Sequence, residues 1–185
     1  MLKNICKLLI VALLPALLLL PRVDAVFSAT MPRKALAESL LLLLGGWAAS
    51  RLCPWRRWAR QAPAAVAAAT LLFLFWMIPR SIDFTQAHPS ANALFVISLC
   101  ATGLLLSHYL PLLPGVARVA YALYFSSMIV ALGLLYACQS TLLCSAYTLE
   151  DQHAFGWMLV PVGLATYLFA LVSVPRWLVP SANGR

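Results

Sequence analysis

Side chains that bind soft metals or form disulfides gather in and beside two short connections of this chain. They are Met77, His88, Cys138, Cys144, His153 and Met158. In an oxidising compartment, Cys138 and Cys144 most simply form a disulfide that would pin their connection onto the rest of the fold. The alternative is a site for a soft metal such as Cu(I), which takes thiolate, thioether and imidazole ligands. The C-x5-C spacing matches none of the strong zinc or thioredoxin patterns, so both interpretations stay open.

The same two connections carry four charged residues, Arg80, Asp83, Glu150 and Asp151. Arg80 and Asp83 are close enough in sequence to pair and stiffen the first connection. An exposed ion pair of this kind contributes under about 1 kcal/mol. All four residues are therefore candidate contacts for a partner protein rather than strong elements of the fold.

His108 is the one histidine inside a long hydrophobic stretch, where ionisable residues are costly and are functional candidates by default. Tyr121 and Tyr124 in the next stretch are candidate hydrogen-bond partners for its ring, which favours a structural role. A bis-histidine haem site would need a second histidine at a similar depth, and His88 and His153 stand at helix ends. The histidine pattern therefore does not favour haem.

Hydrophobic stretches position these residues and fill most of the chain. Hydrophobic residues make up 63% of the 185 residues and charged residues 10%, against roughly 25% charged residues in soluble domains. The stretches are longer than barrel strands and lack period-2 alternation, and helices satisfy their own backbone hydrogen bonds in lipid. We therefore expect an all-α transmembrane helical bundle, residues 26–185, with spans over residues 35–52, 63–78, 91–113, 115–138 and 154–174.

A shorter hydrophobic stretch, Leu8 to Leu20, precedes these spans. Lys3 and Lys7 before it, and the sequence Val23-Asp24-Ala25 after it, are typical of a secretory signal peptide. The stretch is also short for a span, which needs about 17–25 residues. Residues 1–25 are thus either a signal-anchor helix, which makes six helices in all, or a cleaved signal peptide, which leaves five.

The basic residues predict the orientation of the bundle. With the N-terminus in the cytoplasm, most Lys and Arg residues fall on the cytoplasmic side, as the positive-inside rule requires. These are Lys3, Lys7, Arg51, Arg56, Arg57, Arg60, Arg118, Arg176 and Arg185. The outer side then receives Arg22, Arg33, Lys34 and Arg80, together with Asp24, Glu38, Asp83, Glu150 and Asp151. The C-terminus is cytoplasmic too, and tryptophans mark the inner interface (Trp55, Trp58, Trp177) and the outer interface (Trp76, Trp157).

Small residues and prolines predict how the helices pack. Small residues recur four positions apart in the pairs Gly45 and Ala49, Gly46 and Ser50, and Gly103 and Ser107, a spacing that permits close helix contacts. Pro111, Pro114 and Gly115 indicate a tight turn, which predicts an antiparallel hairpin of spans 91–113 and 115–138. The chain shows no phosphate-binding loop, no Ser-His-Asp arrangement and no acidic pair inside a span, so we expect a protein that is not an enzyme.

One third of the chain, about residues 70–125, resembles the CtaG-type multi-pass membrane family. The resemblance rests on the spacing of Phe75-Trp76-Met77-Ile78-Pro79, Asp83, His88, Gly103, His108 and the proline-marked turn to Arg118. That family is linked with assembly of haem-copper cytochrome c oxidases. The resemblance implies a protein of the bacterial inner membrane that accompanies a respiratory oxidase, either in copper insertion or as an accessory subunit.

The sequence thus favours a non-catalytic membrane protein whose outer connections contact subunits of a respiratory oxidase. Their acidic residues would also suit a basic, soluble electron-transfer protein. One alternative is a redox membrane protein that itself binds haem or quinone, and another is a scaffold that fills a gap in a larger membrane complex. Copper is a possible cofactor only in the first case, and nothing in the charge pattern indicates a nucleic-acid partner.

Overall fold

The computed structural model describes residues 13–52 and 59–178, and every regular element in these ranges is a helix. The expected all-α class is therefore confirmed. Residues 13–18 are helical. The later elements are α2 (Pro21–Ser28), the π-helix η1 (Pro32–Glu38), α3 (Ser39–Leu52), the 3-10 helix η2 (Ala59–Gln61), α4 (Ala62–Trp76), α5 (Pro79–Ala87), α6 (Pro89–Tyr109), the 3-10 helix η3 (Leu110–Leu112), α7 (Gly115–Cys138) and α8 (Leu149–Leu178).

Five helical segments are long and apolar enough to cross a membrane, and the protein is a multi-pass helical membrane protein. They cover Pro32–Leu52, Ala59–Trp76, Pro89–Leu112, Gly115–Cys138 and Leu149–Leu178. These segments agree with the five predicted spans, although most begin a few residues earlier. Proline explains two of the earlier starts, because Pro32 and Pro89 occupy the first turn of a helix, where the missing N–H is not needed.

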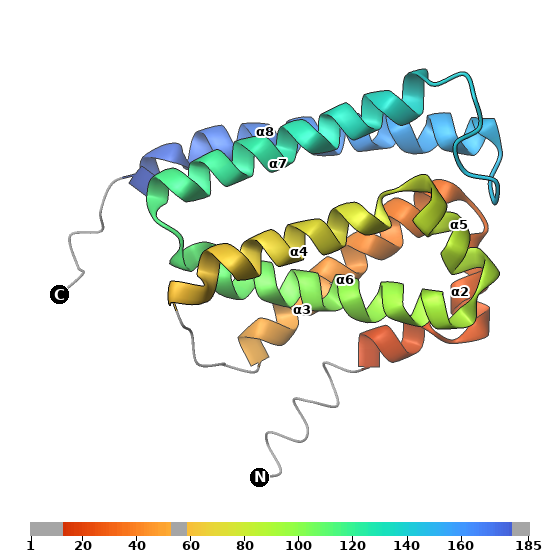
Figure 1. Cartoon of the computed structure of the whole chain (residues 1–185), viewed down its shortest axis with the longest axis horizontal. Helices are drawn as coiled ribbons and strands as arrows, with labels where there is room; N and C mark the ends of the chain where they lie inside the picture. Colours follow the sequence, from red (N-terminus) through yellow and green to blue (C-terminus); the bar gives the residue numbers. More distant parts are fainter. Residues whose placement is uncertain (1–12, 53–58, 179–185) are drawn as a thin grey trace, which may run out of the picture.

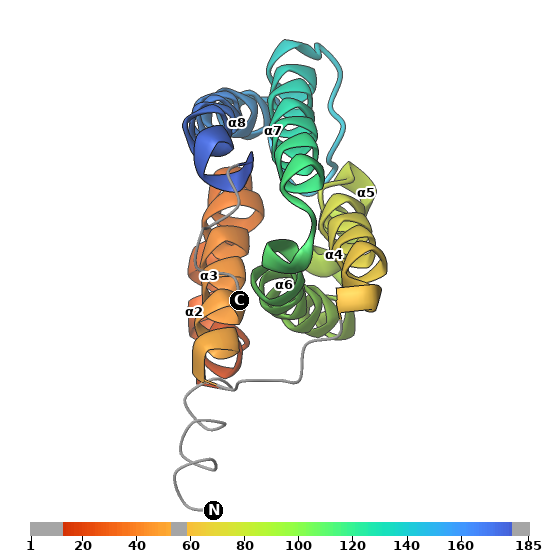
Figure 2. The ribbon, with the colours of Figure 1, turned by 90° about the vertical axis from the view of Figure 1, so that its left-hand side faces the viewer.

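The long helices form two layers (Figure 1). α7 and α8 lie side by side in one layer, while α3, α4 and α6 form the other. Figure 2 shows the layers along the bundle, with α6 between α3 and α4. The main core lies between the layers, where Phe73, Phe95 and Tyr136 are buried together.

The predicted hairpin of spans 91–113 and 115–138 is wrong, because α7 packs along α8 rather than along α6. Leu113 and Pro114 have extended backbones, so the chain leaves the layer of α6 before α7 begins. In the α7–α8 contact, a Cβ atom at Gly156 would collide with the backbone of Ala137 and Gly133. Small residues thus let α7 approach α8 closely, and this contact determines the pairing.

The predicted small-residue contacts are present between α3 and α6. A Cβ atom at Gly46 would collide with the carbonyl oxygen of Cys100, and one at Gly103 would collide with the carbonyl oxygen of Leu43. One turn further along, the hydroxyls of Ser50 and Ser107 share a hydrogen bond across the same contact. These small residues therefore serve packing within the bundle.

The charged residues divide between the two ends of the bundle. We call one the acidic end, which is formed by α2, η1, α5, the 139–148 connection and the starts of α6 and α8 (Figure 1). It holds all five acidic residues of the chain: Asp24, Glu38, Asp83, Glu150 and Asp151. We call the other the basic end, and its described charged residues are Arg51, Arg60, Arg118 and Arg176. Lys3, Lys7, Trp55, Arg56, Arg57, Trp58 and Arg185 lie outside the described residues.

The described part of the N-terminal segment packs into the bundle. Leu18 is buried in the main core, and Leu14 packs against it. The Val23-Asp24-Ala25 sequence lies within α2. The rest of the predicted Leu8–Leu20 stretch, residues 8–12, lies outside the described residues.

Candidate functional site

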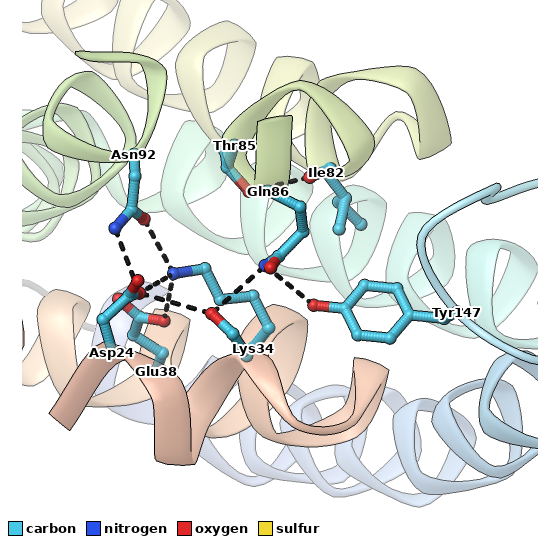
Figure 3. Close-up of polar contacts among 9 residues, drawn as sticks. Asp24, Lys34, Glu38, Ile82, Thr85, Gln86, Asn92 and Tyr147 are labelled. Carbon is cyan, nitrogen blue, oxygen red and sulfur yellow. Dashed lines mark hydrogen bonds and ion pairs between the residues drawn. The ribbon is translucent and has the colours of Figure 1, made fainter. Parts of the chain in front are cut away.

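Lys34 lies at the centre of a buried polar cluster at the acidic end (Figure 3). Its side chain is 1% exposed, and its Nζ atom lies 2.8 Å from Asp24 Oδ1, 2.9 Å from Glu38 Oε2 and 2.7 Å from Asn92 Oδ1. We refer to Asp24, Lys34, Glu38 and Asn92 as the Lys34 cluster. Since an unpaired ammonium group is rarely buried, these partners explain why the lysine lies inside the fold.

Three helices bring the members of this cluster together. Lys34 and Glu38 are four residues apart in η1, so they share one face and form an i,i+4 ion pair. α2 contributes Asp24, and the first turn of α6 contributes Asn92. The ring of Phe95, one turn later in α6, lies 5.3 Å from Lys34 Nζ, within cation–π range.

The π-helical form of η1 is itself unusual. Such turns are rare and occur frequently at functional sites. Here the π-helix continues directly into α3, so Lys34 and Glu38 belong to the first part of the Pro32–Leu52 span. The Lys34 cluster therefore lies where apolar helices begin. Its charged groups form their polar contacts mainly with one another.

The two carboxylates of the cluster have different surroundings. Asp24 is 31% exposed, and its Oδ1 atom accepts hydrogen bonds from Lys34 at 2.8 Å, Asn92 Nδ2 at 3.0 Å and Ser28 Oγ at 3.3 Å. Glu38 is 0% exposed and its Oε2 atom forms an ion pair with Lys34, while neither carboxylate oxygen has a hydrogen-bond partner among the described residues. Glu38 is thus the deeper and less well satisfied carboxylate.

A chain of hydrogen bonds links the Lys34 cluster to the surface. Ser28, bonded to Asp24, accepts from Gln86 Nε2 at 3.2 Å, and the same Gln86 nitrogen donates to Tyr147 OH at 2.9 Å (Figure 3). Tyr147 lies in the 139–148 connection and is 7% exposed. Burial raises its pKa, and the neighbouring acidic groups Cys144, Glu38, Asp24 and Asp151 raise it further.

Asp83 joins the two connections that the sequence singled out. Its Oδ2 atom accepts from Ser145 N at 2.8 Å and Ser145 Oγ at 2.9 Å, and its Oδ1 atom accepts from Ala146 N at 2.9 Å. The predicted Arg80–Asp83 pair is therefore wrong, since this carboxylate holds the backbone of the 139–148 connection. Arg80 is exposed on α5.

The predicted disulfide is not formed in the structure. Cys138 and Cys144 are both free thiols, and Cys138 is exposed at the end of α7. Cys144 is buried and donates a hydrogen bond to the carbonyl oxygen of Pro79 at 3.2 Å. The Cys144 side chain is thus directed to α5, away from a pairing with Cys138.

The other candidate metal ligands are dispersed around the acidic end. Met77 is buried in the core, whereas Met158 is 52% exposed. His88 is exposed and its ring lies tilted against that of Phe84, with ring centroids 4.6 Å apart. His153 Nε2 lies 3.0 Å from the carbonyl oxygen of Gln139. Within residues 13–52 and 59–178, no three His, Cys, Asp or Glu side chains form a group that could hold a metal ion.

The predicted intramembrane residues lie toward the basic end. His108 is 2% exposed and meets the ring of Tyr109 edge-on at 5.5 Å. Tyr121 OH lies 3.1 Å from Thr70 Oγ1, and Tyr124 is 59% exposed. Thr70, Tyr121 and Tyr124 line an apolar groove of about 650 Å³ between α4 and α7. His108 is about 30 Å from His88 along α6, at 1.5 Å per residue, so these two histidines do not share a ligand.

One further residue differs from its predicted role. Trp76 does not mark an interface, because it is 5% exposed, donates to Ser98 Oγ at 2.6 Å and packs edge-on against Phe95. The role of Asp151 as a partner contact stays a prediction, and its backbone N–H donates to Thr148 Oγ1 at 3.1 Å at the start of α8. Glu150 beside it is exposed, as a contact residue requires.

The Lys34 cluster was missed by sequence reasoning, which placed Lys34 in an outer connection. The i,i+4 spacing of Lys34 and Glu38 at the edge of an apolar stretch was the available signal. No protein-family model, curated protein or solved structure matches this chain.

Proposed function

We propose that this protein is a non-catalytic accessory or assembly protein of a respiratory haem-copper oxidase or a related electron-transfer complex. In this proposal it resides in the bacterial inner membrane with both termini in the cytoplasm. Its acidic end faces outward and binds the partner. The choice of partner rests on the resemblance of residues 70–125 to the CtaG-type family.

The observation that carries the proposal is the construction of the acidic end. Asp83 and Gln152 fix the 139–148 connection, because Gln152 Oε1 accepts from Leu143 N at 2.7 Å and Gln152 Nε2 donates to Thr141 O at 3.2 Å. On this braced surface, Arg80, His88 and Glu150 remain exposed. A preorganised charged surface loses little conformational freedom on binding and favours a partner of complementary charge.

The candidate copper ligands do not fit a copper site as they are placed. Cys144 is hydrogen-bonded to a backbone carbonyl, Met77 is in the core, and Met158 lies exposed on α8. The proposal is therefore one of protein binding, and no step of it passes through a metal.

Affinity purification in mild detergent tests this proposal. We expect oxidase subunits to copurify with the tagged protein and their recovery to fall several-fold when Arg80→Glu and Glu150→Lys are combined at the acidic end. Arg60→Glu, a charge reversal in the exposed η2 at the basic end, is the matched control and should leave recovery unchanged. Recovery of the protein alone, together with normal oxidase activity in a deletion strain, would exclude the proposal. Recovery with a different membrane complex would instead favour the scaffold alternative.

The groove between α4 and α7 favours quinone binding as a second candidate function. Its volume of about 650 Å³ is in the range of small-molecule sites, and its wall carries the paired hydroxyls of Thr70 and Tyr121. Solvent extraction of the purified protein should then yield stoichiometric quinone, and Tyr121→Phe should lower the amount of quinone extracted. A quinone-free extract and a spectrum without a Soret band would eliminate the redox alternative.

A further inference from the structure

We propose that the Lys34 cluster is a proton-binding site, in which Glu38 holds one exchangeable proton that reaches it from the acidic end by way of Asp24. The site lies within the first span, between η1, α2 and α6. It is separate from the exposed residues through which partner binding is proposed.

Charge balance within the cluster is the first argument. With all groups ionised, Asp24 and Glu38 carry two negative charges, and Lys34 carries one positive charge. A net charge in a buried position is costly, and the usual remedy is to neutralise it. One bound proton makes the cluster neutral.

The contacts of the two carboxylates indicate which one takes the proton. Asp24 Oδ1 accepts three hydrogen bonds and is partly exposed, so its ionised form is well satisfied. Glu38 is fully buried and meets Lys34 through the Oε2 ion pair, and neither of its carboxylate oxygens has a hydrogen-bond partner among the described residues. Glu38 is therefore the carboxylate that takes the proton.

The ligand that fits the Glu38 carboxylate is a proton rather than a metal cation. Hard metal cations take about six or more oxygen ligands in proteins. The position between Asp24, Glu38 and Asn92 that such an ion would need is occupied by Lys34 Nζ, at 2.7–2.9 Å from all three. A proton needs one acceptor oxygen and no additional space.

The contacts in Figure 3 also provide a route for exchange. A proton from water first binds the partly exposed Asp24 carboxylate, forming an O–H bond. Lys34 then passes one N–H proton to Glu38 Oε2 and receives the Asp24 proton in its place, over separations of 2.9 Å and 2.8 Å. The result is a neutral Glu38, an ammonium on Lys34 and a carboxylate on Asp24, so charge and protons balance.

Other elements around the cluster contribute few titratable groups. Lys34 acts on Glu38 from its own helix and Asp24 acts from α2, while α6 contributes the uncharged Asn92. From the 139–148 connection, the neutral hydroxyl of Tyr147 faces the charges of Glu38 and Asp24, and Asp151 acts on that hydroxyl from the start of α8. Besides burial, the charged groups that control protonation of Glu38 are therefore Lys34 and Asp24.

Infrared spectroscopy tests this proposal, because the chain contains only two glutamates, Glu38 and Glu150. In full-length Glu150→Gln protein with carboxyl-¹³C glutamate, reconstituted in vesicles, Glu38 is the only labelled carboxyl group. We expect a label-shifted band of a protonated carboxyl at neutral pH, which shifts again in D₂O and weakens as the pH is raised. A labelled signal that stays in the carboxylate region down to pH 5 would overturn the proposal, as would a protonated band that does not exchange.

Asp24→Asn provides a second test that depends on the charge argument. This substitution removes one negative charge while keeping the side-chain shape. The positive charge of Lys34 then balances the negative charge of an ionised Glu38, and no bound proton is needed for neutrality. We expect the protonated Glu38 band at neutral pH to fall several-fold and the carboxylate band to grow. Asp151→Asn is the matched control at the same end and should leave the band unchanged. Persistence of the full band in Asp24→Asn would contradict the proposal.

Discussion

A single carboxylate, that of Asp83, connects α5 to the 139–148 connection through three hydrogen bonds. Hydrogen bonds to charged groups are worth about 1.5–3 kcal/mol when buried, and Asp83 is partly exposed. We therefore expect Asp83→Ala to lower the free energy of unfolding by about 1–2 kcal/mol, as measured by denaturant titration in detergent.

The effect of this substitution can be measured locally at Cys144, which belongs to the 139–148 connection and is buried against Pro79. Loosening the connection should expose the thiol and increase its maleimide labelling at neutral pH. Glu150→Gln removes an exposed carboxylate from the same end and should change neither stability nor labelling. Equal labelling of Cys144 in wild type and Asp83→Ala would show that Asp83 does not hold the connection.

Cys144 should also show an unusual pH dependence. Burial raises the pKa of its thiol from the ordinary 9.0 to about 12, and the neighbouring Asp83 carboxylate is the second cause of this rise. At pH 8 its thiolate fraction is then about a thousandfold below that of an ordinary exposed thiol. With Cys144 as the sole cysteine, alkylation should stay slow at pH 8–9 and accelerate toward pH 12. An ordinary alkylation rate at pH 8 would contradict this prediction.

The raised pKa of Cys144 also links stability to pH. Below about pH 9 the thiol is protonated in both folded and unfolded states, so its contribution is fully present. Between about pH 9 and 12 only the unfolded state releases the proton, and the free energy of unfolding falls as the pH rises. Tyr147, whose pKa is also raised, acts in the same direction. Cys144→Ala should make the decline in this window shallower.

These side-chain contacts could not be predicted from the sequence. The charged residues of the acidic end were recognised, but their partners were not, because Asp83 and Ser145 are 62 positions apart. Lys34 was assigned only to the outer side, without its buried partners, for the same reason, since Asn92 is 58 positions away. Hydropathy along the chain does not contain such pairings, which depend on how helices pack.

At the level of helices, the sequence predicted which segments form spans more successfully than it predicted which helices pack together. Long apolar runs predict spans directly, because lipid offers the backbone no hydrogen bonds. The choice between α6 and α8 as neighbour of α7 depends on surface fit. Gly156 and Gly163 allow α8 to approach the backbone of α7 closely, at Ala137 and at Val130 respectively. Connection length alone favoured the wrong neighbour.

The α3–α6 contact leads to a prediction about small residues. Gly46→Ala and Gly103→Ala each place a Cβ atom against backbone of the facing helix, which cannot yield without separating the helices. We expect each to destabilise the protein by about 1–3 kcal/mol, measured by thermal unfolding in detergent. Gly45→Ala is the matched control, because its Cβ would meet only the flexible side chain of Leu14. Equal losses at positions 45 and 46 would refute the assignment of this contact.

For the molecule as a whole, the two ends differ in charge and in construction. The acidic end carries the Lys34 cluster and the braced 139–148 connection, whereas the described charged residues of the basic end are arginines. Positively charged residues remain on the cytoplasmic side during insertion. This asymmetry predicts that the acidic end faces outward, and the proposed partner depends on that orientation.

Thiol labelling with a membrane-impermeant maleimide measures the orientation. Cys138 is exposed at the acidic end, so in a protein with this sole cysteine we expect labelling in intact spheroplasts. Arg60→Cys, in a cysteine-free background, places a thiol in the exposed η2 at the basic end and should react only after permeabilisation. Because the two sites lie at opposite ends of one bundle, their labelling must be reciprocal. If Cys138 reacts only after permeabilisation and Arg60→Cys reacts before it, the acidic end is cytoplasmic, and an outer-face partner is excluded.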